Sequence, residues 1–485
     1  MTQTALSDTD PLAPLGLGPE HWLCNSWRPS HDEKAYTIER IEGEVPRELN
    51  GTFFRNGPSQ HILPEGGHEA LHLFDGDGMV HAFRFEDGQV GYRGRFVRNE
   101  SFLVEAEVGR FCMNSVGVQV DNPTERVSIR QQHNTNVVHH GGKLMALVEN
   151  AWPFEIDGLS LDPRGETDFG CERLGMSVSA HPHIDGRTGQ MVIHGYQPFE
   201  PYYQVYVVEP DGRASLAEPV AAPYPVMMHD IAITENHIIL LLCPTVIDGE
   251  RLMAGGSFGE CVSWQPDKGL RFGIRRREAG SAVRWFDAPT PAFIFHTGNA
   301  YEEEGKVYMD ACSHLDGAGL LDTLSVARGG QPGGGAGAYP YLYEFDLEGG
   351  ACRETRLGDR SAEFPRLDER LAGYKNRYGF ALVEGPTGSP LAGGSLCRYD
   401  RQGGTSVYYD LGQGQFPGEP VFVPRSADSP EGDGFLLSVV YDAPQDGSYV
   451  AVFDATDLAA GPMARAHLEH RIPMGFHGNF VSGVV

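Results

Sequence analysis

The 485-residue sequence predicts an all-β protein and, within that class, a propeller of many short strands. Three observations support this fold class. Short runs of β-branched and aromatic residues, each closed by Gly, Asp, Asn or Pro, recur along the chain, whereas helical periodicity is hard to find. The 62 glycines and 33 prolines supply the turns that many short strands need. Radial repetition also accommodates this length in one unit without long exposed sheet edges.

The expected strands follow one another along the chain, and each has the length of a typical strand. Each is rich in β-branched, aromatic or other apolar residues, and the first follows a Gly-Gly turn. They cover Lys143 to Val148, His237 to Leu242, Lys306 to Met309, Tyr341 to Phe345, Ser406 to Asp410, Gly434 to Tyr441 and Tyr449 to Phe453. No repeated blade signature accompanies them, so the pattern alone does not give the number of blades.

Two segments are expected to lie outside the packed core. Residues 1–34 form an N-terminal arm that we expect to be partly disordered, and residues 35–485 form a single propeller domain. The glycine-rich stretch from Gly329 to Gly337 has too little apolar surface to hold one conformation, and it predicts a mobile surface loop.

The charge of the chain excludes one large class of partners. With 38 basic and 66 acidic residues the formal net charge is −28, whereas nucleic acids are bound by clustered Lys and Arg. We therefore expect no nucleic-acid partner.

The termini and apolar runs indicate a cytoplasmic protein. The acidic N-terminus has no basic and apolar pattern of a secretory signal, and the run from Ile238 to Cys243 is far shorter than a bilayer span. The eight cysteines show no Cys-x-x-Cys spacing, which indicates free packing thiols.

Four of the nineteen histidines stand in distinctive contexts, and three of them follow apolar residues that would draw them inside. A lone histidine is more often a satisfied core or turn residue than a metal ligand. The spacings of 48, 67 and 181 residues match no zinc-finger or His-Glu-x-x-His pattern. An all-imidazole site would suit Zn, Cu, Fe or Ni rather than Mg or Ca. The four are His181, His229, His296 and His477.

Three glutamates stand where a solvated carboxylate is not expected. A buried imidazole is stable with a metal on one ring nitrogen and a carboxylate on the other, so buried histidines call for such partners. Glu149 lies in Ala-Leu-Val-Glu-Asn, Glu363 precedes Phe-Pro, and Glu419 precedes Pro-Val-Phe-Val. We take these three as the candidate partners.

The four histidine contexts resemble, in order, the ligand motifs of the carotenoid cleavage oxygenases. This family includes the apocarotenoid oxygenases, the vertebrate retinoid isomerase and the lignostilbene dioxygenases. Further matching stretches extend the resemblance from about residue 35 to the C-terminus: Gly51-Thr-Phe-Phe-Arg-Asn-Gly-Pro58, Leu73-Phe-Asp-Gly-Asp-Gly-Met79 and Glu419-Pro-Val-Phe-Val423.

The resemblance implies a seven-bladed propeller with Fe(II) on its axis, under a cap of loops and short helices. The four histidines would be the ligands. Glu149, Glu363 and Glu419 would orient His229, His296 and His477 respectively, and His181 would have no carboxylate. Thr135 matches a threonine that crowds one metal position in some members, although a turn-forming threonine is an equal alternative.

The resemblance also bears on the substrate. The family cleaves a conjugated C=C bond with O₂ to two carbonyl products. The stilbene-cleaving branch holds its substrate's phenol with a Tyr and a Lys, and these positions are Phe96 and Val148 here. Because neither can hydrogen-bond a phenol, we expect a carotenoid or apocarotenoid. Phe96, Val148, Trp152 and Phe295 are candidate tunnel walls, with plain core packing as the alternative.

Other functions remain open at this stage. One is a lignostilbene-type dioxygenase acting on a stilbene or phenylpropene, and another is a propeller that binds an apolar ligand without cleaving it. A third is a metalloenzyme that is not an oxygenase. An insoluble substrate also suggests transient membrane contact during its capture. The oligomeric state does not follow from the sequence.

Overall fold

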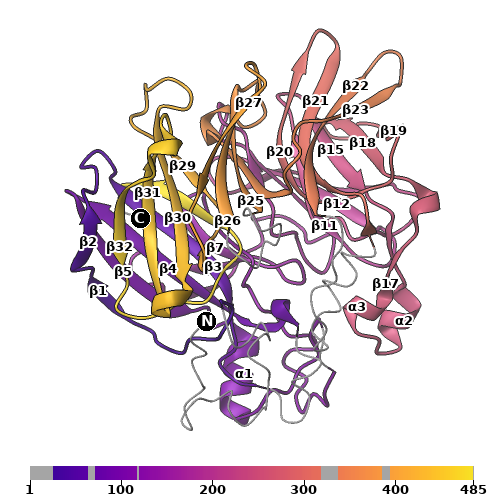
Figure 1. Cartoon of the computed structure of the whole chain (residues 1–485). Coiled ribbons are helices and arrows are strands. Elements are labelled where there is room, and N and C mark those ends of the chain that lie inside the picture. Colours follow the sequence, from indigo (N-terminus) through magenta and orange to yellow (C-terminus); the bar gives the residue numbers. More distant parts are fainter. Residues whose placement is uncertain (1–25, 64–71, 117–118, 318–336, 385–393, 484–485) are drawn as a thin grey trace.

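The protein is a seven-bladed β-propeller, as Figure 1 shows for the computed structural model. The structure describes residues 26–63, 72–116, 119–317, 337–384 and 394–483. Residues 1–25 of the expected arm and 329–336 of the glycine-rich stretch lie outside the described residues. The all-β fold class and the propeller are therefore confirmed.

Five of the blades are four-stranded antiparallel sheets in simple chain order. The strands are β6 (Asn136–His140), β7 (Lys143–Leu147), β8 (Phe154–Ile156) and β9 (Pro163–Glu166); β10 (His183–Ile184), β11 (Met191–Tyr196), β12 (Tyr203–Val208) and β13 (Ala214–Val220); β14 (Ile231–Ile233), β15 (His237–Leu242), β18 (Arg271–Arg276) and β19 (Arg284–Asp287); β20 (Phe293–Glu303), β21 (Lys306–His314), β22 (Ala338–Asp346) and β23 (Cys352–Arg356); β24 (Ala362–Leu367), β25 (Tyr378–Glu384), β26 (Gly394–Asp400) and β27 (Thr405–Asp410).

The other two blades combine strands from both ends of the chain. One has the order β1 (Ala35–Thr37), β5 (Gln89–Phe96), β4 (Asp77–Glu86), β3 (Gly51–Ser59) and β33 (Gly478–Ser482). The other runs β2 (Arg40–Gly43), β32 (Pro462–His467), β31 (Gly447–Asp454), β30 (Gly434–Asp442) and β28 (Gln415–Pro417), with β29 (Val421–Pro424) also paired to β30. Figure 1 shows these N-terminal and C-terminal strands side by side, so the two ends of the chain close the ring.

Apolar side chains between neighbouring blades form the core. In one cluster Ile239 and Phe272 of one blade pack with Phe293, Met309 and Tyr343 of the next, and all are buried. The strand segments expected from the sequence lie within β7, β15, β21, β22, β27, β30 and β31, except that β7 ends at Leu147. The described cysteines are unpaired.

The short helices lie in the lower part of Figure 1, with α1 apart from α2 and α3. They are α1 (Glu100–Val108), α2 (Gly249–Met253) and α3 (Phe258–Cys261), with the short hairpin β16 (Thr245–Ile247) and β17 (Val262–Trp264) beside them in sequence. The chain leaves the sheets towards these helices at the ends of β5 and β15, and β14 begins at that same edge. Within the described residues no helix is long and apolar enough to cross a bilayer.

Candidate metal centre

Each blade contributes one candidate side chain where its innermost strand begins. Most of these inner strands contact one another around the ring: β33 contacts β6 and β29, and β10, β14, β20, β24 and β29 contact one another in that order. Each of these strands starts close to the ring axis, on the face of the ring where the short helices lie. The residues at the strand starts therefore converge. The residues are Thr135 before β6, His181 before β10, His229 before β14, His296 in β20, Glu363 in β24, Glu419 before β29 and His477 before β33.

The four imidazoles form one buried cluster. The ring centroids of His181 lie 4.3 Å from His229, 5.1 Å from His296 and 4.6 Å from His477. His296 lies 5.2 Å from His229 and 4.8 Å from His477. One nitrogen from each of His181, His296 and His477 lies within 4.8 Å of the others, so these atoms can share one ion.

The cluster has the chemistry of a metal site. Nε2 of His181 and Nε2 of His296 are buried without any hydrogen-bond partner among the described residues, which is costly unless another group binds them. Burial, followed by the neighbouring imidazoles, lowers the pKa of His181 well below its ordinary value. Burial also lowers the pKa of His477 to about 4. Both rings are thus neutral at pH 7, which is the form that binds metals.

A carboxylate contacts each of the other three rings. Glu149 contacts Nδ1 of His229, a Glu363 oxygen lies 2.6 Å from Nδ1 of His296, and a Glu419 oxygen lies 2.9 Å from Nδ1 of His477. Among the described residues, no carboxylate pairs with His181. An ionised carboxylate on Nδ1 fixes the tautomer that leaves Nε2 free for a metal.

The pKa values of these carboxyl groups agree with that role. Burial raises the pKa of Glu363, but His296 and His314 outweigh it and hold the pKa well below its ordinary value. For Glu419, Arg366 and His477 outweigh burial and lower the pKa to about 2. Both groups are therefore ionised hydrogen-bond acceptors at neutral pH.

Two strand irregularities aim side chains into the cluster. The register of β20 against β21 shifts between Ile294 and Thr297, around His296. That of β24 against β25 shifts between Glu363 and Arg366, where Phe364 has φ of +54°. A bulge redirects a side chain that would otherwise follow the alternation of its strand. Such local insertions leave no sequence signal, so Phe364 escapes prediction from the sequence.

Phenylalanine rings pack beside His296. Phe364 lies 5.1 Å from it at an interplanar angle of 24°, and Phe295 lies 5.8 Å away at 26°. Phe295 also meets His229 edge-on at 4.9 Å. These rings give the cluster an apolar wall on this side. Of the four candidate tunnel residues, Phe295 thus lies directly against the histidines.

The other three candidate tunnel residues lie elsewhere in the buried interior. Phe96 ends β5 and packs with Met79 and Phe102. Val148 follows β7 and precedes Glu149 in the chain, and it is 9% exposed. Trp152 packs with Tyr206 in the core between two blades and donates its indole N–H to a backbone carbonyl.

Thr135 is tied to the cluster through the backbone. Its carbonyl accepts the backbone N–H of His477 at 3.1 Å, and its hydroxyl donates to Asn134 at 3.1 Å. Asn56, in the Arg-Asn-Gly-Pro motif, donates its side-chain amide to the carbonyls of His133 and Asn136. This amide fixes the start of β6, and with it Thr135, against β3.

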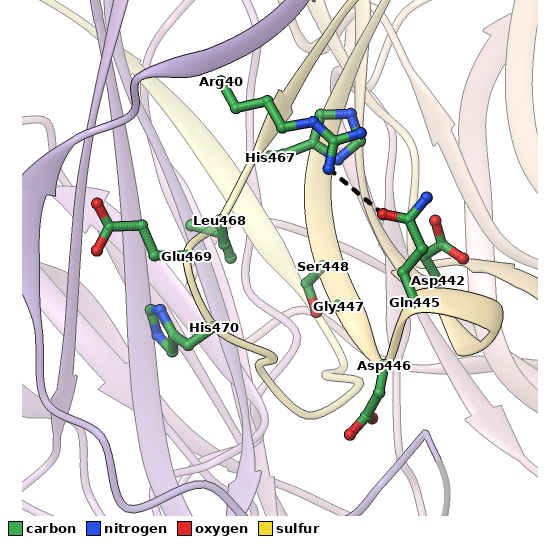
Figure 2. Close-up of a pocket in the computed structure, with 10 residues that line it drawn as sticks. All are labelled: Arg40, Asp442, Gln445, Asp446, Gly447, Ser448, His467, Leu468, Glu469 and His470. Carbon is green, nitrogen blue, oxygen red and sulfur yellow. Dashed lines mark hydrogen bonds between the residues drawn. The ribbon is translucent and has the colours of Figure 1, made fainter. Parts of the chain in front are cut away.

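The cavity in Figure 2 is separate from this cluster. It has a volume of about 200 Å³ and lies between outer strands of the blade that contains β2 and β32, and no residue that lines it belongs to the histidine cluster. Its lining is largely polar, with Arg40, Asp442, His467 and His470 among the residues. Nothing here resembles the four-histidine arrangement.

Comparisons with known proteins agree on one family. The model described as retinal pigment epithelial membrane protein matches residues 27–482. The chain is 33% identical to carotenoid 9,10(9',10')-cleavage dioxygenase 1 of Pisum sativum, over 96% of this chain and 90% of that protein. It is 34% identical to isoeugenol monooxygenase of Pseudomonas nitroreducens, over 91% and 94%. The cobalt-substituted apocarotenoid oxygenase of Synechocystis superposes with a TM-score of 0.87 at 27% identity, over 96% and 99%.

Proposed function

Since the chain belongs to the carotenoid cleavage oxygenase superfamily, matched by the retinal pigment epithelial membrane protein model, we propose that it is an Fe(II) oxygenase that cleaves a conjugated C=C bond of a carotenoid or apocarotenoid. The products would be two carbonyl compounds, with the oxygen drawn from O₂. The observation that carries the proposal is the convergence of four buried imidazoles from four blades, two of which have Nε2 atoms without a partner among the described residues.

The residues fit an iron ion. His181, His229, His296 and His477 would hold it, because imidazole nitrogens suit divalent iron and the outward nitrogens of three rings are fixed by carboxylates. When bound, iron supplies the activation of dioxygen. The chain's own contribution is to fix the rings and to exclude water.

The apolar wall determines where the substrate can lie. Phe295 and Phe364 line the histidines, and they offer a polyene dispersion contacts but no hydrogen bonds. Phe96 and Val148, in place of a Tyr and a Lys, are buried and cannot bind a phenol. A long apolar polyene loses nothing at such positions. This supports the carotenoid class over the hydroxystilbenes.

A phenylpropene or stilbene is the second candidate substrate. The isoeugenol monooxygenase relative is as similar in sequence as the carotenoid dioxygenase relative, so similarity alone does not choose between the two substrate classes.

The experiment is anaerobic Fe(II) loading followed by aerobic incubation with an apocarotenal, with 4-hydroxystilbene and with isoeugenol, and identification of products by mass spectrometry. Aldehydes from the polyene alone would support the proposed substrate. Aldehydes from a phenolic substrate alone would overturn the argument from Phe96 and Val148. Cleavage of none, with tight binding of the polyene, would favour a binding role.

Delivery of such a substrate suggests contact with a membrane surface, because polyenes partition into lipid. We expect the protein, otherwise cytoplasmic, to associate transiently with liposomes that carry the apocarotenal. Turnover of liposome-borne substrate without measurable association at any salt concentration would contradict this.

A further inference from the structure

A histidine and an aspartate form a largely buried pair beside α1 in the first blade, outside the four-histidine cluster. His61 follows the end of β3, and Asp77 is the first residue of β4. Nδ1 of His61 lies 2.8 Å from Oδ2 of Asp77, and the backbone N–H of His61 donates to the same oxygen at 3.2 Å. The pair plays no part in the metal centre described above.

The other ring nitrogen of His61, Nε2, is buried and has no hydrogen-bond partner among the described residues. The ring stacks on Phe102 at 3.9 Å and meets Phe96 edge-on at 6.1 Å. A buried polar atom in aromatic surroundings costs free energy unless a water or a ligand satisfies it. This nitrogen is therefore a candidate contact for a bound molecule.

A second metal ion does not fit here, although His61, Asp77 and Glu105 bring potential ligand atoms within 4.8 Å of one another. The fully buried guanidinium of Arg130 already contacts one oxygen of each carboxylate. It lies 2.5 Å from Asp77 and 2.9 Å from Glu105. His61 contacts the second oxygen of Asp77 and the backbone N–H of Cys112 donates to that of Glu105, so a cation would have to displace existing donors. The expected ligand is thus an uncharged polar group.

The pair and the metal centre both contact β3. β3 aligns the two sites, because Asn56 in this strand donates its backbone N–H to the carbonyl of His477, while Ser59 pairs with Asp77. Asn56 and Ser59 are three residues apart in this extended strand, which is a distance of about 10 Å. Phe74, three residues before Asp77, packs 5.4 Å from Phe476, the neighbour of His477. A substrate held at the metal centre could therefore reach His61 with its ring end.

The direction of the hydrogen bond follows from Asp77. Burial raises the pKa of Asp77, but Arg130 and His61 outweigh it and lower the pKa to about 2. The carboxylate can then only accept, so Nδ1 of His61 carries the proton. The tautomer with its single proton on Nδ1 has a lone pair on Nε2, which can accept an O–H.

We propose that His61, positioned by Asp77, accepts a hydrogen bond from a hydroxyl group on the ring end of the substrate. The inference rests on the proposed oxygenase function and makes it more specific: the chain discriminates between hydroxylated and unhydroxylated ends of a conjugated substrate. A phenol and a ring hydroxyl of an oxygenated carotenoid share this chemistry. His61 would take over, from a different position, the hydroxyl recognition that Phe96 and Val148 cannot provide.

The test compares two pairs of ligands that differ in one hydroxyl group. One pair is isoeugenol and its methyl ether, and the other is a 3-hydroxy-apocarotenal and its 3-deoxy form. Affinity is measured anaerobically on the iron-loaded protein by quenching of tryptophan fluorescence, so that no turnover is needed. We expect the wild type to bind the hydroxylated member of at least one pair about tenfold more tightly. The pair that shows the difference identifies the source of the hydroxyl.

The variants are His61→Phe, which keeps a ring against Phe102, and His61→Gln, which keeps an acceptor. Loss of discrimination in His61→Phe with partial recovery in His61→Gln supports the proposal. The matched control is His470→Phe. His470 also bonds a partner through Nδ1 and has an unpartnered Nε2, but it lines the outer cavity of Figure 2, where we expect no effect.

Two results overturn the proposal. Equal affinity of the wild type for both members of each pair means that a water alone satisfies His61, and unchanged discrimination in His61→Phe places the hydroxyl elsewhere. Failure of the proposed oxygenase function would give a different result. The hydroxylated ligand would still bind more tightly, but no ligand would be cleaved in air. Melting temperature and iron content of each variant establish that folding and the metal centre are intact.

Discussion

Each glutamate beside the histidine cluster has a second partner on its outer side. The hydroxyl of Tyr196 donates to Glu149. Nε2 of His314 lies 2.8 Å from Glu363, and the guanidinium of Arg366 lies 3.1 Å from Glu419. A carboxylate held from two sides cannot rotate away from its imidazole. The orientation of three of the four rings thus depends on a phenol, an imidazole and a guanidinium that lie outside the cluster.

Replacing Glu363 by Gln tests this arrangement at a single residue. The amide keeps the volume but removes the negative charge beside His296, so we expect iron affinity to fall about 10- to 100-fold. Anaerobic competition titration against a chelator measures the affinity. Glu302→Gln is the matched control, because Glu302 pairs with His237 at 2.9 Å away from the cluster. Equal loss of affinity in both variants would contradict the role of Glu363.

At the scale of the elements, two glycines allow the segment that carries His477 to approach β3. A Cβ atom on Gly475 would lie 2.5 Å from the carbonyl oxygen of Asn56, and one on Gly57 would lie 2.5 Å from Cα of Gly475. Both contacts involve backbone atoms, which cannot move without displacing a strand. Close packing of backbone on backbone therefore positions this ligand histidine.

Gly475→Ala should push the segment away from β3 and destabilise the fold by about 1–3 kcal/mol. Because His477 is two residues away, iron affinity should fall as well. Thermal unfolding and metal titration measure the two effects. Gly447→Ala is the control, since its Cβ would meet no atom closer than 3.8 Å. Unchanged iron binding in Gly475→Ala would show that the ligand tolerates a shifted backbone.

Glu302 ties the turn between β14 and β15 to β20. It accepts from Thr234, Asn236 and His237, and these donors outweigh burial and lower its pKa to about 2. A folded pKa below the unfolded value of about 4.3 gives stability that is complete above that value and is lost as the pH falls towards 2.

The matching prediction concerns acid stability. Glu302→Gln should have a lower melting temperature than the wild type at pH 7, and the difference should narrow between pH 6 and pH 3.5. Scanning calorimetry at a series of pH values measures it. A difference that stays constant over this range would mean that the carboxylate has an ordinary pKa.

At the scale of the whole molecule, strands from the two ends of the chain close the ring. The C-terminal β33 pairs with β3, and the N-terminal β2 pairs with β32. β33 starts immediately after His477, and the backbone N–H of Gly478 donates to Glu419 at 2.9 Å. Ring closure and the metal centre thus depend on the same few residues.

A chain that ends at His477 should therefore lose both the closure of the ring and an intact metal centre. Without β33 we expect a lower melting temperature and iron affinity reduced at least about tenfold, because Glu419 loses a donor and His477 becomes terminal. A chain that ends at Ser482 keeps β33 and serves as the control. Iron bound equally well by both chains would show that closure by β3 and β33 is not needed for the site.

Part of this protein could be predicted from the sequence alone. The all-β fold class follows from strand-length apolar runs and frequent turn residues, since both are local properties. The unusual contexts of four histidines and three glutamates single out the candidates, although their spacing matches no pattern. Their resemblance to known motifs supplied the seven blades, and the ligand roles remain predictions.

The remaining features were decided by the tertiary structure. His296 meets Glu363, and His477 meets Glu419, because neighbouring inner strands start at the same edge, although the members of each pair are 67 and 58 residues apart in the chain. The bulge that turns Phe364 towards His296, the outer partner Tyr196 and the unpartnered nitrogen of His61 likewise have no local signature. A sequence pattern reports which face of a strand is buried, whereas the neighbours of a side chain depend on strand register and on how the blades pack.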